Sequence, residues 1–209
     1  MIPQEYMHRT LKALVNVLEK IVVMGDPYTA GHMSRVKDIC ALLSEELNVT
    51  DGKGMRWGIA VAASIHDIGK IFVPANILAK PGKLSEAECM ILKEHPIKGY
   101  DLLKNIEFDW PIADIVLQHH ERWDGTGYPN GLEGSAIMTE ARILSIADVF
   151  EALVSHRPYR PAYSEEEAMN LIMNDKGYGF DPTVVGAMWN LYSAGKLDKY
   201  IAVPVPKEE

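Results

Sequence analysis

Apolar residues recur every three or four positions along almost the whole chain, which is the spacing of one face of an α-helix. Three stretches near the start show this spacing: Leu11, Leu14, Val15, Leu18 and Val22; Val36, Ile39, Cys40, Leu43 and Leu47; and Trp57, Ile59, Ala60, Ala63 and Ile65. No segment alternates apolar and polar residues cleanly enough for a core strand. With 209 residues the chain can bury a sizeable core. We therefore predict a single all-α domain.

Capping and turn residues predict where further helices begin and end. Ser85 with Glu88, and Ser164 with Glu167, have the spacing of capping boxes. Pro111 and the pair Asp181-Pro182 should begin two more helices, the first ending near His119 and His120, and residues 139–154 should form an apolar helix. We expect Gly69 to help end the helix that carries His66, and residues 71–84 and 123–134, rich in glycine and proline, to be loops.

Charge and composition exclude several classes of protein. The formal net charge of −8 argues against duplex DNA as a partner, since binding to DNA needs a basic face. The two cysteines, Cys40 and Cys89, are not in a C-x-x-C pair, so a disulfide framework or a thiolate zinc site is not expected. The chain shows neither a transmembrane stretch nor the layout of a signal peptide. We expect a cytoplasmic protein that does not bind a membrane.

Five histidines and two aspartates have the chemistry of metal ligands. His66 is followed by Asp67, His119 by His120, and the remaining three, His32, His95 and Asp148, lie on or beside other predicted helices. Imidazole and carboxylate ligands suit iron, manganese or zinc, and one carboxylate can bridge two ions. Two ions close together would suit phosphodiester cleavage, because they can activate a shared water and stabilise developing charge. His8 and His156 have no such neighbours, so we assign them surface or structural roles.

Two motifs resemble those of a known family. His32, the run from His66 to Lys70 and then Asp148 resemble the H…HD…D ligand set of the HD phosphohydrolase superfamily. The run His119–Pro129, HHERWDGTGYP, matches the HHExxDGxGYP signature of the HD-GYP family at every fixed position. The similarity extends from about Asp26 to Ala187. It implies an HD-type helical domain with a metal site in its core, which hydrolyses cyclic di-GMP to pGpG, GMP or both. We take residues 1–25 as a leading helix and 26–209 as the catalytic domain.

The resemblance also implies a role for each matching residue. The first metal ion would be held by His32, His66, Asp67 and Asp148, with Asp67 bridging to a second ion on His95, His119 and His120. Asp67 and Lys70 would be catalytic, Lys70 by contacting the scissile phosphate. Tyr128, Arg157 and Arg160 would contact substrate phosphates. The expected cofactors are two divalent ions, iron or manganese.

Some features leave alternatives open. Where some family members have a glutamate that binds a third metal ion, this chain has Tyr28, which predicts a binuclear site and a product that stops at pGpG. Arg157 and Arg160 could instead be a solvated pair. Glu121, Trp123 and Asp124 could simply brace their loop, with Glu121 or Asp124 orienting a ligand histidine.

The sequence also leaves the substrate and the partners open. The alternatives to cyclic di-GMP are another cyclic dinucleotide such as cyclic GMP-AMP, a different nucleotide phosphate, or a catalytically silent module that binds the nucleotide. The first helix could pack on the core, form a homodimer, or transmit a signal from an upstream sensory or receiver domain. The sequence does not decide whether the chain is an excised domain or stands alone.

Overall fold

The computed structural model describes residues 13–22, 31–49, 55–156 and 160–200, and the structure below concerns these residues. Residues 13–22 are helical. The labelled helices are α2 (His32–Glu46), α3 (Met55–Ile65), α4 (Ala75–Leu78), α5 (Glu86–Leu92), α6 (His95–Leu103), α7 (Ile112–Gln118), α8 (Thr139–Val154), α9 (Glu165–Asn174) and α10 (Pro182–Ser193). Short 3₁₀ segments cover Ile68–Phe72, Gly134–Ala136 and Asp198–Tyr200. The described residues contain isolated β-bridges but no strand, so the predicted all-α fold is confirmed.

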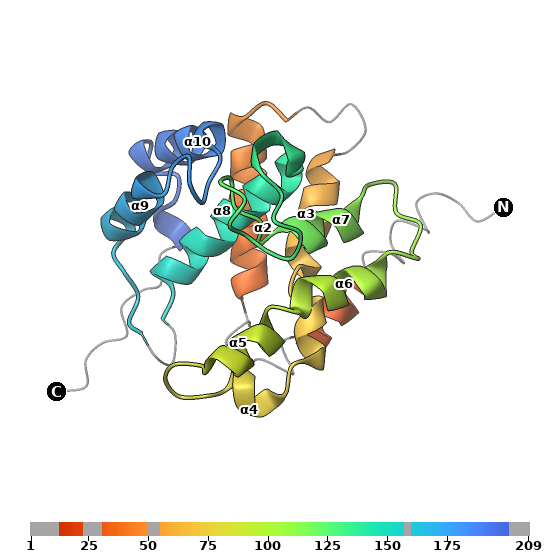
Figure 1. The fold of residues 1–209 in the computed structure, drawn as a ribbon. Helices are drawn as coiled ribbons and strands as arrows, with labels where there is room; N and C mark the ends of the chain where they lie inside the picture. Colours follow the sequence, from red (N-terminus) through yellow and green to blue (C-terminus); the bar gives the residue numbers. More distant parts are fainter. Residues whose placement is uncertain (1–12, 23–30, 50–54, 157–159, 201–209) are drawn as a thin grey trace.

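Helix α2 lies at the centre of the fold, packed against α3 on one side and α8 on the other. In Figure 1, α9 and α10 lie beyond α8, whereas α6 and α7 lie on the side of α3. Among the described residues, no helix combines the length and the apolar character needed to cross a bilayer.

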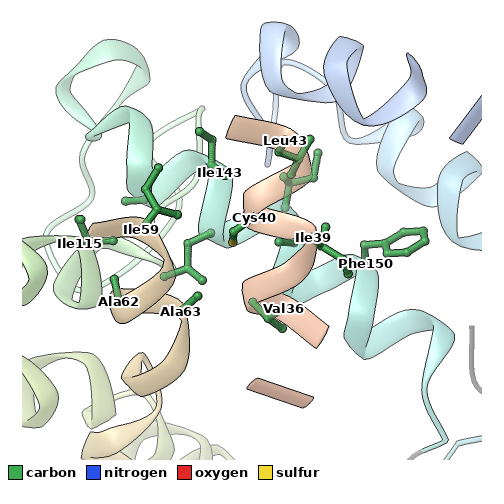
Figure 2. Close-up of a cluster of buried hydrophobic side chains, with 14 of the residues drawn as sticks. Val36, Ile39, Cys40, Leu43, Ile59, Ala62, Ala63, Ile115, Ile143 and Phe150 are labelled. Atoms are coloured by element: carbon green, nitrogen blue, oxygen red, sulfur yellow. The ribbon is translucent and has the colours of Figure 1, made fainter. Parts of the chain in front are cut away.

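The core is built from the apolar faces predicted by helical spacing. Val36, Ile39 and Leu43 of α2 are fully buried, and they pack with Phe150 of α8 and Ile59 of α3 (Figure 2). Full burial of one such aliphatic side chain stabilises the fold by roughly 1.5–3 kcal/mol. The N-terminal helical segment joins the same core through Val15 and Val22. The predicted boundary at residue 25 lies outside the described residues and stays a prediction.

The predicted caps are present. In α5, the Ser85 hydroxyl accepts from the Glu88 amide at 3.3 Å, and the Ser85 amide donates to the Glu88 carboxylate at 2.6 Å. Ser164 and Glu167 make the same reciprocal pair at the start of α9. At α10 the Asp181 side chain accepts from the Thr183 amide at 2.7 Å. Each cap satisfies amides that have no partner within the first helical turn.

One segment differs from the prediction of a loop over residues 71–84. The structure places the end of a 3₁₀ segment and the four-residue helix α4 within it. Pro74 stands at the N-cap of α4, where its missing amide costs no hydrogen bond, and Ile77 is buried and anchors the turn. Proline therefore starts a helix here as well as ending the preceding one.

Gly69 has a different role from the predicted helix end. Helix α3 already ends at Ile65, and Gly69 lies within the 3₁₀ segment that follows. A Cβ at Gly69 would lie 1.9 Å from the His95 carbonyl oxygen and 2.7 Å from the Gly99 amide nitrogen. Only glycine lets this segment approach the backbone of α6 so closely. The approach places the residues after α3 beside His95.

We expect Gly69→Ala to lower the free energy of unfolding by about 3 kcal/mol, because rigid backbone rather than a flexible side chain occupies the added volume. Denaturant unfolding of the metal-free protein measures this. Gly186→Ala in α10 is the matched control: a Cβ there meets nothing within 4 Å, so helix propensity should stabilise that variant by up to about 1 kcal/mol. Equal effects of the two substitutions would contradict the close-approach role.

Candidate metal centre

The structure brings all seven predicted ligand residues together. His32, His66 and Asp67 form one group, and His95, His119 and His120 form a second, with the ligand atoms of each group within 4.8 Å of one another. Asp148 of α8 closes the first group, because its Oδ1 lies 3.1 Å from His32 Nε2 and 3.8 Å from His66 Nε2.

Most of these residues lie at helix ends. His66 and Asp67 follow the last residue of α3, His95 is the first residue of α6, and His119 and His120 follow α7. Within a regular helix, adjacent side chains point about 100° apart and could not face one centre. Beyond the last helical residue the backbone is free to turn, which explains how two adjacent pairs can each supply both side chains.

Asp67 lies between the two groups. Its Oδ2 is 3.5 Å from His66 Nε2, and its Oδ1 is 3.4 Å from His95 Nε2. The ammonium of Lys70, one turn further along, lies 2.6 Å from Oδ2. Burial alone would raise the pKa of Asp67, but the positive charge of the adjacent Lys70 ammonium holds it well below the usual range. The carboxylate therefore stays ionised, with one oxygen facing each group.

Backbone carbonyls orient three of the histidines. The Nδ1 atoms of His66, His95 and His119 lie 2.8, 2.8 and 2.6 Å from the carbonyl oxygens of the residues three positions earlier. Donation from Nδ1 leaves the lone pair on Nε2 facing the centre. The Nε2 of His66 is buried and has no hydrogen-bond partner among the described residues. A buried, unpaired lone pair beside carboxylates is the arrangement that a cation satisfies, so these residues fit a metal ion.

His32 is oriented differently, by a residue that the sequence analysis missed. Its Nδ1 hydrogen-bonds Glu151, a fully buried carboxylate of α8. Glu151 also accepts from Arg35 Nε and from the Ser155 hydroxyl, each at 2.6 Å. Because Glu151 lies three residues after Asp148, both project from one face of α8. That spacing was the available signal in the sequence.

The two groups differ in charge. Burial would lower the pKa of His32, but Asp148 and Glu151 raise it to about 9. Burial lowers the pKa of His95, of His119 and of His120, that of His120 to about 3. In the metal-free protein at neutral pH, His32 is therefore an imidazolium, whereas the histidines of the second group are neutral and able to donate lone pairs.

We call residues 119–134 the signature loop, because they include the run His119–Pro129. Several of its side chains mainly hold its shape. Glu121 accepts from the amides of Asn130 and Leu132 at 2.7 and 3.0 Å, and Asp124 accepts from the Thr126 amide at 3.0 Å. The prediction that these acids brace the loop is confirmed. Neither hydrogen-bonds a histidine in the described part of the chain, so the idea that one of them orients a ligand is wrong.

A turn between α9 and α10 fastens this loop from outside, a contact the sequence analysis did not anticipate. Arg122 makes a bidentate pair with Asp175 at 3.1 and 3.0 Å. The amide of Trp123 donates to the carbonyl of Gly179 at 3.2 Å, and that of Asp124 donates to the carbonyl of Tyr178 at 2.8 Å. The position of the loop therefore depends on residues about fifty positions further along the chain.

Of the residues predicted to contact substrate phosphates, Tyr128 lies beside the histidines of the second group and Arg160 does not. Tyr128 stacks on His120, with ring centroids 4.9 Å apart and planes 25° apart. Arg160 instead donates to the carbonyls of Ala152, Leu153 and Pro161 near the end of α8, so its phosphate-binding role stays a prediction. Arg157 and Tyr28 lie outside the described residues.

Replacing Glu151 should weaken metal binding. Glu151→Gln removes the charge that orients His32, so we expect about ten- to hundredfold lower affinity for Mn²⁺. Isothermal titration calorimetry measures the affinity, and a thermal melt verifies folding. Glu140→Gln, which changes another buried carboxylate of the same helix, is the control. Unchanged affinity in a folded Glu151→Gln protein would contradict the role of Glu151.

Metal binding should also depend on pH through His32. An ion that takes the Nε2 lone pair must displace a proton held with a pKa of about 9. Affinity for Mn²⁺ should therefore rise by up to about tenfold per pH unit from pH 7, and level off as the pH passes that pKa. Calorimetry in buffers of different ionisation enthalpy should show close to one proton released at pH 7. Release of no proton would contradict the charged state of His32.

Comparison with known proteins agrees with this geometry. The HD domain family model matches residues 16–184. The chain is 41% identical over 187 residues to a cyclic di-GMP phosphodiesterase response regulator of Xanthomonas campestris, covering 88% of this chain and 48% of the relative. It is 37% identical over 178 residues to a 3'3'-cGAMP-specific phosphodiesterase of Vibrio cholerae, covering 85% and 38% respectively. The chain thus spans less than half the length of these curated relatives.

Solved structures share the fold. An HD-GYP-type protein of Bdellovibrio bacteriovorus superposes with a TM-score of 0.63 at 22% sequence identity, over 78% of this chain and 51% of that one. At this identity the likeness concerns the fold alone. Together with the family match and the intact run His119–Pro129, it leads to one conclusion: the chain belongs to the HD domain family, among its HD-GYP members.

Proposed function

We propose that this chain is a two-metal phosphodiesterase that hydrolyses cyclic di-GMP to pGpG. The observation that carries the proposal is the Asp67 carboxylate, which has one oxygen towards each histidine group and Lys70 beside it. A divided ligand set joined by one carboxylate suits two divalent ions, and an adjacent ammonium suits a phosphate. The similarity to cyclic di-GMP phosphodiesterases supports the choice of substrate.

Each group would hold one ion. His32, His66, Asp67 and Asp148 would bind the first, and His95, His119, His120 and the second oxygen of Asp67 would bind the other. Nitrogen and oxygen donors without thiolate suit iron or manganese. When bound, such ions supply Lewis acidity towards the phosphate and make a nearby water more acidic.

The chain's own residues would position and neutralise the substrate. Asp67 enters the reaction ionised, because its pKa is held low. Lys70 is partly exposed, and its ammonium donates to the Asp67 carboxylate at 2.6 Å. From this position the positive charge of Lys70 would stabilise a non-bridging oxygen of a scissile phosphate bound beside Asp67. The neutral histidines of the second group are ligands rather than proton donors.

The alternatives differ in substrate and in activity. Because one relative is a 3'3'-cGAMP-specific phosphodiesterase, 3'3'-cGAMP is a second candidate substrate for this chain. A catalytically silent binding module would have little need for seven converging ligands, because a binding surface does not require a complete ligand shell. A homodimer, or an upstream sensory or receiver domain in a longer protein, stays a prediction.

The decisive assay loads the protein anaerobically with Fe²⁺ or Mn²⁺, counts bound ions and separates the products formed from cyclic di-GMP. We expect two ions per chain and pGpG as the product. Lys70→Ala should keep both ions but lower kcat by about a hundredfold or more. The substitution removes the positive charge that would stabilise the negative charge developing on the phosphate. Lys98→Ala, which changes a lysine paired with Glu94, should leave kcat unchanged.

Other outcomes have distinct meanings. A wild-type protein that holds two ions, binds cyclic di-GMP and yields no product would favour the silent module. Faster turnover of 3'3'-cGAMP than of cyclic di-GMP would mean that 3'3'-cGAMP is the preferred substrate. The proposed phosphodiesterase reaction would still stand. Three ions per chain would contradict the binuclear site inferred from Tyr28.

A further inference from the structure

A second lysine, Lys93, lies beside the candidate site. The Lys93 ammonium lies over the ring of Tyr128, 5.1 Å from its centroid. The same ring stacks on His120. Because a stacked imidazole leaves no room for an ammonium on its side of the ring, Lys93 must approach from the opposite face or the rim. Lys93, Tyr128 and His120 therefore form a series that runs from the surface to the second histidine group.

Backbone hydrogen bonds fix the position of Lys93, and its side-chain ammonium has no acidic partner among the described residues. Lys93 is the C-cap of α5, where its backbone amide donates to Cys89 and Ile91, and it lies two residues before His95. Its side chain is exposed and makes no ion pair with any carboxylate in the described part of the chain. Glu94, the adjacent acid, lies 3.8 Å from Lys98 instead.

A cyclic dinucleotide presents two phosphodiesters on opposite sides of its ring, and only one can be cleaved at a time. In the proposed function the two ions and Lys70 serve the scissile phosphate. Arg160, which the sequence predicts as a phosphate contact, donates to three backbone carbonyls and stacks on Tyr163. Among the described residues, Lys93 is thus the exposed cation next to Tyr128 without an acidic partner.

We infer that Lys93 binds the second, non-scissile phosphate of the cyclic dinucleotide and so selects for a substrate with two phosphodiesters. The inference rests on the proposed function. The cation–π contact with Tyr128 is weak at an exposed site, and an ammonium leaves it readily for a phosphate oxygen. Lys93 would therefore act on substrate binding rather than on the chemical step.

Two substrates separate this role from a structural one. The metal-loaded protein is assayed with cyclic di-GMP, which has two phosphodiesters, and with bis(p-nitrophenyl) phosphate, which has one. Lys93→Ala should raise KM for cyclic di-GMP about tenfold, as expected for loss of a charge-assisted hydrogen bond at an exposed site, with kcat almost unchanged. Its KM for bis(p-nitrophenyl) phosphate should not change. Lys93→Arg, which keeps the charge, should restore most of the binding of cyclic di-GMP.

The chain offers a matched control. Lys104 is the C-cap of α6, and its ammonium also lies over a tyrosine ring, 5.8 Å from the centroid of Tyr100. Lys104 lies at the C-terminal end of α6, whereas His95 is its first residue, and the Lys104 ammonium pairs with Asp101. Lys104→Ala should change KM for neither substrate.

Each result bears on the inference separately from the proposed function. An unchanged KM for cyclic di-GMP in Lys93→Ala would overturn the inference while leaving the phosphodiesterase intact. An equal rise in KM for both substrates would also overturn it, because Lys93 would then act through Tyr128 and His120. A wild-type protein that cleaves bis(p-nitrophenyl) phosphate but no cyclic dinucleotide would overturn the proposed function, and the inference with it.

Discussion

The buried carboxylate of Asp67 is the constraint around which the site is arranged. Its oxygens lie 3.5 Å from His66 Nε2 and 3.4 Å from His95 Nε2, and a charge so placed is unfavourable unless cations surround it. Lys70 supplies one such charge, and bound metal ions would supply the rest. The close contact of Gly69 with the α6 backbone makes the arrangement possible, because it brings the end of α3 and the start of α6 together.

Helix ends do most of the positioning. A backbone carbonyl three residues earlier orients each of His66, His95 and His119, so the same local geometry sets the tautomer of three candidate ligands. His32 depends on the buried charge of Glu151 instead. This difference means that the first group would have a proton to lose if a metal ion binds, whereas the second group is neutral.

In the signature loop, local sequence predicts some contacts and not others. Its glycines and acids predict a braced turn, and Glu121 and Asp124 do brace it. Its attachment to the turn containing Asp175 could not be predicted, because a bidentate ion pair between residues 53 positions apart leaves no periodic pattern. Glu151 was overlooked for a related reason: an acid in an apolar helix is ordinary until its burial and its partner are known.

The sequence by itself determined the helical class, the capped starts of α5, α9 and α10, and the identity of the seven ligand candidates, because periodicity, caps and signatures are properties of neighbouring residues. The resemblance implied a division of these seven side chains into two groups joined by Asp67, but only tertiary structure shows them lying together in that arrangement. Tertiary structure also decided that Arg160 is engaged with the end of α8 while Lys93 faces Tyr128. These outcomes depend on how helices distant in sequence pack, and packing is set by contacts that no local pattern encodes.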